Sequence, residues 1–260
     1  MANANLSFNA LKRIAAASLA LAVAFAAPAS AQSELPVLRD VNIENAVRTR
    51  LAQDPGDFFQ NGTGFFVARG ELVVTSAHVV GGCRDIKVID AGGNEHDAGL
   101  LIWDGRRDVA VLRMAQMYRY GGLSLRRPDL NRRGEERPAP PIARPMGFVM
   151  RFGPNMPTRA EPVFLGENPM RVLVGAHPSG TYEMLRFRIS LDPGSSGSPV
   201  LDDDAQVVGL VTALANGMTL GTPLRDIARA VQASGYDPFD QTYAQQIRDP
   251  TDFIVKLRCR

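Results

Sequence analysis

The sequence predicts an all-β protein with one short helix near its C-terminus, and two observations support that fold class. From Gly62 onward the chain consists of short apolar runs separated by turn residues, and only the segment 223–234 has helical length and spacing. Strands and helices do not alternate as they would in a parallel α/β sheet. We therefore expect a barrel or a sandwich.

The elements of the first half follow from these short runs. Residues 64–68 and 71–74, joined by Arg69-Gly70, predict a β-hairpin, and residues 87–89, 100–103 and 109–112 predict further strands. Before them, residues 32–60 form a lead-in in which apolar residues at helical spacing predict a short amphipathic helix over 43–51. These strands, within about residues 60–120, would make up the first half of the domain.

The second half begins with a stretch of different composition. Residues 118–161 are rich in Arg, Pro and Gly, so we expect a connection with long surface loops there. The arginines of this segment could bind an acidic partner, but solvated loop charge is the favoured interpretation. Apolar and charged residues alternate over 185–189 and predict a half-buried strand, and residues 200–211 predict a hairpin with an acidic turn at 202–204.

Helix signals bound the segment 223–234, which follows the strands of about 140–220. Thr222 is a suitable N-cap, Pro223 suits the first helical position, and Gly235 is a stop signal. Leu224, Ile227, Ala228 and Val231 would form the apolar face. The domain would then span residues 32–235, with residues 236–260 as a C-terminal tail.

The N-terminus has the features of a signal peptide over residues 1–31. Lys12 and Arg13 precede an apolar run over 14–27, and Ala29-Ser30-Ala31 supplies the small residues of a cleavage site. The mature chain would begin at Gln32. The alternative, a retained membrane anchor, is disfavoured by that site and by the short apolar run. We expect a periplasmic or secreted protein without a membrane anchor after cleavage.

Charge and cysteine content exclude several classes of ligand. Residues 1–31 carry two positive charges and no negative ones, so their removal takes the net charge from +2 to 0. This balance gives no electrostatic footprint for nucleic acid. Because no C-x-x-C pair is present, we expect no zinc site, and nothing in the sequence calls for a metal or an organic cofactor. Cys83 and Cys259 could pair in an oxidising compartment, or they could be two unrelated thiols.

Three segments carry residues suited to nucleophilic catalysis. His78 follows an apolar strand, Asp108 begins a buried run, and Ser196 lies between Gly194 and Gly197. A serine hydroxyl becomes nucleophilic beside an imidazole whose tautomer is held by a buried carboxylate. The glycines allow backbone geometry that side chains would block. The N–H groups of Gly194 and Ser196 could then stabilise an oxyanion.

At these residues the chain resembles the trypsin-like serine peptidases, in particular the bacterial HtrA-like and glutamyl-endopeptidase-like branch. The matching motifs are Ser76-Ala77-His78, Asp108 to Leu112, and Gly194 to Pro199, in the order that the family has. The resemblance runs from about Gly62 to Val231. It implies a chymotrypsin-like fold of two six-stranded antiparallel β-barrels, with the catalytic triad between them. Taken alone, each motif also has an ordinary structural interpretation: Asp108 as a turn residue, His78 as a structural histidine, and the glycine- and serine-rich segment as a flexible loop. We interpret His96 and His177 as structural.

The chain departs from the family pattern at several points, and these departures narrow the kind of peptidase that we expect. Ser195 stands where digestive members have an aspartate that pairs with a new amine terminus, so the oxyanion loop must be ordered in another way. About 25 residues follow the helix, too few for the PDZ domain of HtrA proteins, which leaves a monomer or small oligomer as the expectation. By the family register, Ser190, Val211, Thr212 and Ala213 would line a small-to-medium, neutral S1 pocket. Asp192 has no assigned pocket role.

The sequence therefore predicts an exported serine endopeptidase that acts on polypeptide substrates through an acyl-enzyme intermediate. His78, Asp108 and Ser196 would form the triad. The alternative is a protease-like module that binds peptides with little or no catalysis. An esterase with the same residues is a further alternative, which only substrate profiling separates from the first.

Overall fold

The computed structural model describes residues 37–38, 60–118, 121–128, 148–152, 160–164, 170–174, 182–187, 191, 194–215, 218–240 and 249–260. The chain divides into two compact units, residues 1–34 and 35–260, and every described residue belongs to the second. The predicted signal peptide and the predicted helix over 43–51 lie outside the described residues. Among the helices of the described residues, none is long and apolar enough to cross a membrane.

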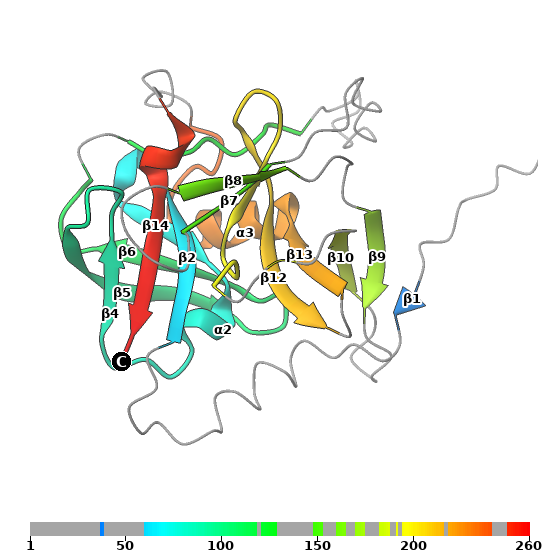
Figure 1. The fold of residues 1–260 in the computed structure, drawn as a ribbon, viewed down its shortest axis with the longest axis horizontal. Helices are drawn as coiled ribbons and strands as arrows, with labels where there is room; N and C mark the ends of the chain where they lie inside the picture. The colour runs from blue at the N-terminus through cyan, green and yellow to red at the C-terminus, as the bar shows by residue number, and fades with distance from the viewer. Residues whose placement is uncertain are drawn as a thin grey trace, which may run out of the picture. The chain divides into compact units, whose positions relative to one another are not determined.

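Six strands form a closed antiparallel barrel in the order β14-β2-β3-β6-β5-β4 (Figure 1). Their bounds are β2 Gln60–Val67, β3 Leu72–Thr75, β4 Ile86–Ile89, β5 Glu95–Asp104, β6 Val109–Met114 and β14 Ile254–Cys259. Each pair of neighbours is antiparallel. The predicted six-stranded antiparallel barrel is thus present. The predicted hairpin over 64–74 corresponds to β2 and β3, with the short helix η1 (Ala68–Gly70) at its turn.

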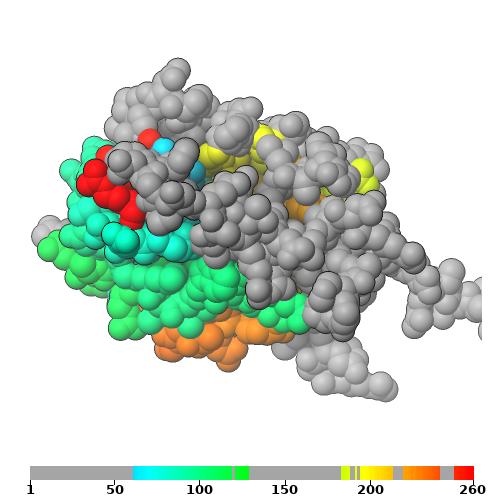
Figure 2. All heavy atoms as spheres, turned by 90° about the horizontal axis from the view of Figure 1, so that it is seen from below, coloured from blue at the N-terminus to red at the C-terminus, as the bar shows by residue number. Residues whose placement is uncertain are grey.

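The sixth strand of this barrel comes from the predicted C-terminal tail. Strand β14 pairs with β2 on one side and β4 on the other, so it closes the barrel. Figure 2 shows the C-terminal residues in red beside the cyan and teal residues of the barrel. The prediction of a barrel confined to residues 60–120 was therefore wrong, because the last strand arrives from a distant part of the sequence.

The second half forms an eight-stranded sheet in the order β1-β9-β10-β13-β12-β11-β7-β8. Its strands are β1 Val37–Leu38, β7 Phe148–Phe152, β8 Ala160–Phe164, β9 Met170–Val174, β10 Tyr182–Phe187, β11 Pro199–Leu201, β12 Val207–Ala215 and β13 Met218–Pro223. The expected closure into a second six-stranded barrel is not seen among the described residues. Strand β7 lies in the segment 118–161, where we expected a connection with long surface loops, but within the range of about 140–220 expected for the strands of the second half.

Helix α3 (Leu224–Ala233) follows β13 directly, close to the predicted helix over 223–234. Pro223 occupies the N-cap position, one residue later than the predicted cap Thr222. The helix buries Ile227, Ala228 and Val231 in a core that it shares with the first barrel. Leu201, Val207 and Leu210 of the second sheet join the same cluster, so this core extends from the first barrel into the second sheet.

Candidate active site

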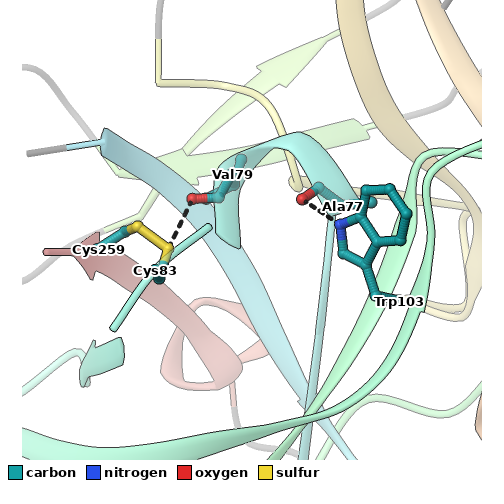
Figure 3. The surroundings of a disulfide bond; sticks show 5 residues. All are labelled: Ala77, Val79, Cys83, Trp103 and Cys259. Carbon is teal, nitrogen blue, oxygen red and sulfur yellow. Dashed lines mark hydrogen bonds between the residues drawn. A yellow bond between two sulfur atoms is a disulfide. The ribbon is translucent and has the colours of Figure 1, made fainter. Parts of the chain in front are cut away.

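His78 lies in the short helix α2 (Ala77–Val80), directly after strand β3. All four residues of this helix are buried, and His78 is 5% exposed. The indole Nε1 of Trp103, on β5, donates to the carbonyl oxygen of Ala77 at 3.0 Å (Figure 3). The helix is too short to be stable alone, so these tertiary contacts hold the histidine in place.

Asp108 meets His78 through both of its carboxylate oxygens. The backbone N–H of His78 donates to Oδ1 at 2.8 Å, and the distance between His78 Nδ1 and Asp108 Oδ2 is 2.7 Å. Asp108 is fully buried, and a buried carboxylate requires a donor. Nδ1 therefore carries the proton, which leaves Nε2 of His78 as the nitrogen able to accept one.

The backbone of Asp108 has an uncommon conformation for a residue other than glycine, with φ of 53°. It ends the turn between β5 and β6. The hydroxyl of Thr222 donates to the carbonyl oxygen of Arg107, immediately before Asp108, at 2.6 Å. The hydroxyl groups of Thr222 and Thr212 lie 3.0 Å apart, and both residues are fully buried. The second sheet thus holds the turn that presents Asp108.

An ion-pair network supports the same turn. The guanidinium of Arg107 contacts Asp104 at 2.8 Å and Asp226 of α3 at 3.1 Å. The hydrogen bond with Asp104 is the main reason why the pKa of Arg107 is raised above its ordinary value. Burial raises the pKa of Asp226, although the nearby guanidinium groups lower it in part. The network links the aspartate turn to α3.

The loop around Ser196 is held by backbone hydrogen bonds. The N–H of Gly197 donates to the carbonyl oxygen of Val211 at 2.8 Å, and the N–H of Ser198 donates to that of Ser195 at 3.0 Å. Gly197 has φ of 87°, where an L side chain is strained. A Cβ at this position would lie 1.9 Å from the Thr63 carbonyl oxygen, so only glycine fits.

The histidine and serine segments meet on one backbone group of strand β12. Ser76 Oγ, two residues before His78, donates to the carbonyl oxygen of Val211 at 2.9 Å. The same oxygen accepts from Gly197 N, next to Ser196. Residues that lie about 120 positions apart in the sequence are therefore brought together here. Hydrogen bonds to Val211 thus join the segment that carries His78 to the segment that carries Ser196.

The other predicted site residues are less accessible or lie outside the described part of the chain. The side chains of Val211 and Thr212 are 2% and 0% exposed, so neither is open to a ligand in this structure. Ser190, Asp192 and the side chain of Ala213 lie outside the described residues. The assignment of these residues to the S1 pocket stays a prediction.

The two histidines interpreted as structural have different outcomes. His96 Nε2 lies 2.9 Å from Oδ2 of Asp90, within the hairpin of β4 and β5. Asp90 also accepts from the backbone and side chain of Asn94, which is a typical turn arrangement. His177 lies outside the described residues. In the part of the chain that is described, no group of three or more potential ligands could hold a metal ion.

Cys83 and Cys259 form a disulfide with a Cα–Cα distance of 5.4 Å across 176 positions of sequence (Figure 3). It joins the last residue of β14 to the loop after α2. Cys83 Sγ lies 3.8 Å from the Val79 carbonyl oxygen, one residue after His78. The disulfide therefore anchors one end of the histidine helix, and Trp103 contacts the other end.

Sequence reasoning did not find the hydroxyl groups that organise this site. Thr63, Ser76 and Thr222 each donate to a backbone carbonyl of a segment more than 100 positions away. The only local signal was the placement of Thr63 between two glycines, Gly62 and Gly64. Hydroxyl partners depend on tertiary contacts, which a linear motif does not encode.

With this geometry in place, the comparison with known families is direct. The profile of the trypsin-like peptidase domain family matches residues 62–210, more than half of the chain. The chain therefore belongs to the trypsin-like peptidase domain family. The matched range includes all three predicted triad residues.

Several of the similar curated proteins are serine proteases of the HtrA and DegP-like types. The chain is 28% identical over 168 residues to mitochondrial serine protease HTRA2 of Bos taurus, covering 63% of this chain and 34% of that protein. It is 27% identical over 156 residues to the "Probable periplasmic serine endoprotease DegP-like" of Chlamydia muridarum, covering 60% of this chain and 29% of that protein. The chain thus spans about a third of the length of the curated relatives it matches.

Solved structures support the fold. The inactive form of the Rv3671c protease has a TM-score of 0.51 and 22% identity, covering 78% of this chain and 100% of that one. The active form of the same protease, from M. tuberculosis, has a TM-score of 0.50 and 21% identity, covering 77% of this chain and 90% of that one. At this level of identity the likeness concerns the fold alone.

Proposed function

We propose that this protein is a serine endopeptidase that hydrolyses peptide bonds through an acyl-enzyme intermediate. The observation that carries the proposal is the pair of contacts between His78 and Asp108, at 2.8 and 2.7 Å. It supplies an imidazole with a defined tautomer next to a serine loop that shares its backbone anchor. Membership of the trypsin-like peptidase domain family supports the same reaction.

In the proposed reaction, Ser196 Oγ attacks the carbonyl carbon of the scissile bond while Nε2 of His78 takes the hydroxyl proton. Asp108 stabilises the resulting imidazolium. The N–H groups of Gly194 and Ser196 would donate to the oxyanion. As the C–N bond breaks, His78 returns its proton to the leaving amine, and water then hydrolyses the acyl-enzyme by the same steps. The substrate would be a polypeptide, with a neutral P1 residue.

Labelling with a fluorophosphonate probe tests the nucleophile directly. Wild-type protein should be labelled and should hydrolyse casein, and Ser196→Ala should lose both properties because the attacking oxygen is absent. Ser124→Ala is the matched control, since Ser124 is a buried serine outside the site whose hydroxyl has no hydrogen-bond partner. Equal labelling of wild type and Ser196→Ala would contradict the assignment. A folded wild type that binds peptide but is never labelled would indicate the non-catalytic alternative.

We further propose that the protein acts in an oxidising, exported compartment. The Cys83–Cys259 disulfide supports this, because disulfides persist mainly outside the cytosol. The periplasmic relative of Chlamydia muridarum is consistent with it. N-terminal sequencing of protein from fractionated cells should find Gln32 first, in a periplasmic or secreted fraction. Recovery of an uncleaved N-terminus in the cytosol would contradict export.

A further inference from the structure

Thr63 on strand β2 makes three hydrogen bonds around the serine loop, and it is fully buried. Its hydroxyl donates to the carbonyl oxygen of Gly194 at 2.7 Å. Its backbone N–H donates to the carbonyl oxygen of Ser196 at 2.9 Å. Its own carbonyl oxygen accepts from the hydroxyl of Thr75 at 2.7 Å, which holds Thr63 itself in place. One residue of the barrel thus holds both ends of the segment 194–196.

This segment needs such a restraint at Gly194, which has no side chain to limit its rotation. Gly194 has φ of 95°, and a Cβ at this position would meet nothing within 4 Å. At Gly194 itself, neither a side chain nor crowding around the Cβ position therefore limits the backbone dihedral angles. Ser195 contributes no restraint through its side chain, because its buried hydroxyl has no hydrogen-bond partner. Among the described residues, Thr63 is the one whose side chain donates a hydrogen bond to the Gly194 carbonyl oxygen.

We propose that Thr63 is a positioning residue that orders the oxyanion loop, in place of an ion pair made by the residue before the nucleophile. The inference rests on the proposed peptidase function. By holding the carbonyl of Gly194, the hydroxyl sets the plane of the peptide between Gly194 and Ser195. The hydrogen bond from the Thr63 N–H to the carbonyl oxygen of Ser196 sets the plane of the peptide between Ser196 and Gly197. These two bonds fix the peptide planes on either side of the Ser195–Ser196 peptide, which carries the Ser196 N–H. They also limit rotation at Gly194, whose N–H is the second donor, so both donors are held ready before substrate binds, as oxyanion stabilisation requires.

Two substitutions separate the hydroxyl from the rest of the residue. Thr63→Val keeps the shape and both backbone hydrogen bonds but removes the donor, and Thr63→Ser keeps the donor. Thr219→Val is the matched control, because Thr219 is a buried threonine on β13 whose hydroxyl has no partner. If Thr63→Val does not fold, Thr63→Ala takes its place in every measurement. Thr63→Ala removes the same hydroxyl and adds no second γ-carbon that the core would have to accommodate.

The kinetic measurement distinguishes positioning from general support of the fold. In Thr63→Val, kcat for a peptide amide should fall on the order of tenfold to a hundredfold, while KM changes little. The affinity for a peptide boronate, whose tetrahedral adduct occupies the oxyanion position, should fall by a similar factor. Thr63→Ser should recover kcat to within about threefold, and Thr219→Val should resemble wild type. A Thr63→Val enzyme with wild-type kcat, or a Thr63→Ser enzyme no better than Thr63→Val, would overturn the proposal.

A second measurement does not depend on catalysis. Amide hydrogen exchange over residues 191–198 should be faster in Thr63→Val, by about tenfold, than in wild type, Thr63→Ser or Thr219→Val, while exchange in β6 stays the same. Unchanged exchange would reject the positioning role even in an active peptidase. The two proposals can also fail separately. If exchange is faster in Thr63→Val but fluorophosphonate never labels the wild-type protein, the positioning role is supported and the peptidase function is rejected.

Discussion

Gly197 lies at a point where the serine loop touches the barrel. Its φ of 87° and the missing Cβ both matter, since that atom would lie 1.9 Å from the Thr63 carbonyl oxygen and 2.4 Å from the Thr75 hydroxyl. Because one contact is with backbone, the loop rather than a side chain would have to move. The serine segment can therefore reach the barrel only with glycine at this position.

Gly197→Ala should lower kcat/KM at least a hundredfold and the free energy of unfolding by about 2–4 kcal/mol, because the serine loop is displaced. Steady-state kinetics and urea unfolding measure the two effects. Gly235→Ala is the matched control, since Gly235 has φ of 90° but open space around a Cβ. It should cost only about 1 kcal/mol and leave activity unchanged. Equal effects of the two variants would show that the clash with Thr63 is unimportant.

Asp90 has a pKa below its ordinary value. Burial alone would raise that pKa, but the hydrogen bonds with His96 and Asn94 lower it by more. The charged carboxylate is thus favoured in the folded state, and its contribution to stability is present above the unfolded pKa of about 3.9. That contribution is lost as the pH falls through the lower, folded pKa.

Asp90→Asn should therefore lower the free energy of unfolding at pH 7 by about 1–2 kcal/mol, because the buried network loses its negative charge and one of its two acceptor oxygens. The difference from wild type should shrink below about pH 4, where the wild-type carboxyl is protonated in the unfolded chain. Urea unfolding at pH 7 and at acid pH measures it. Asp97→Asn, which alters an exposed ion pair with Lys87, should have little effect at either pH. A difference independent of pH would contradict this account.

At the scale of single residues, the residue types of the predicted triad were predictable, because nucleophilic catalysis by serine requires a histidine and an acidic residue. His78, Asp108 and Ser196 belong to short motifs whose order is itself a constraint. Thr63 and Thr222 were not predictable, because their role is to donate to carbonyls that only folding brings near. For the same reason, the burial of Val211 and Thr212 could not be inferred from their register beside the site.

At the scale of elements, helix α2 shows how a four-residue helix can hold a reactive side chain. The disulfide anchors the chain after its C-terminal end, and Trp103 contacts its N-terminal end (Figure 3). Asp108 orients the imidazole of His78. The disulfide acts on the position of the helix, whereas the hydrogen bonds with Asp108 set the direction of the ring. These two effects should therefore be separable by mutation.

The double variant Cys83→Ser/Cys259→Ser should lose about 3–5 kcal/mol of stability, because the disulfide closes a loop of 176 positions. Below its melting temperature, it should retain a His78–Asp108 pair and measurable activity. Thermal unfolding and kinetics at 25 °C test both parts, and wild type treated with a thiol reductant should behave like the variant. An unchanged Tm would contradict the stabilising role of the disulfide.

Element types were predictable where a local pattern specified them. Helix α3 follows from its apolar spacing and its stop signal at Gly235, and the hairpin of β2 and β3 from two apolar runs around a turn. Strand β14 also alternates, since Val255, Leu257 and Cys259 are buried while Lys256 and Arg258 are partly exposed. This alternation alone does not identify the partners of β14, because the segment follows a helix and both partner strands, β2 and β4, lie far away in the sequence.

At the scale of the whole molecule, β14 determines whether the first barrel exists. It bonds to both β2 and β4, and it buries Ile254, Val255 and Leu257 in the core. Without it, two strand edges and an apolar interior would be exposed to water. Strand β2 carries Thr63, so the loss would reach the proposed site as well.

A chain that ends at Gly235 should therefore fail to fold cooperatively, although it contains every predicted catalytic residue. Size-exclusion chromatography and thermal unfolding, with the full chain expressed in parallel, measure this. We expect aggregation or the absence of a cooperative transition, and no fluorophosphonate labelling. A truncated chain that unfolds cooperatively near the Tm of the full chain would show that five strands are sufficient.

The sequence by itself determined which residues the proposed chemistry would use: a serine, a histidine and an aspartate in family order, on short strands with one helix. These features depend on residue type and local period, which a linear chain displays. Only the tertiary structure decided how the site is assembled: β14 as the closing strand, an eight-stranded sheet where a second closed barrel was expected, and Thr63 as the anchor of the serine loop. Such features depend on which distant strands pair and on which buried hydroxyls find acceptors, because strand pairing and hydrogen bonding are set by contacts across the fold rather than along the chain.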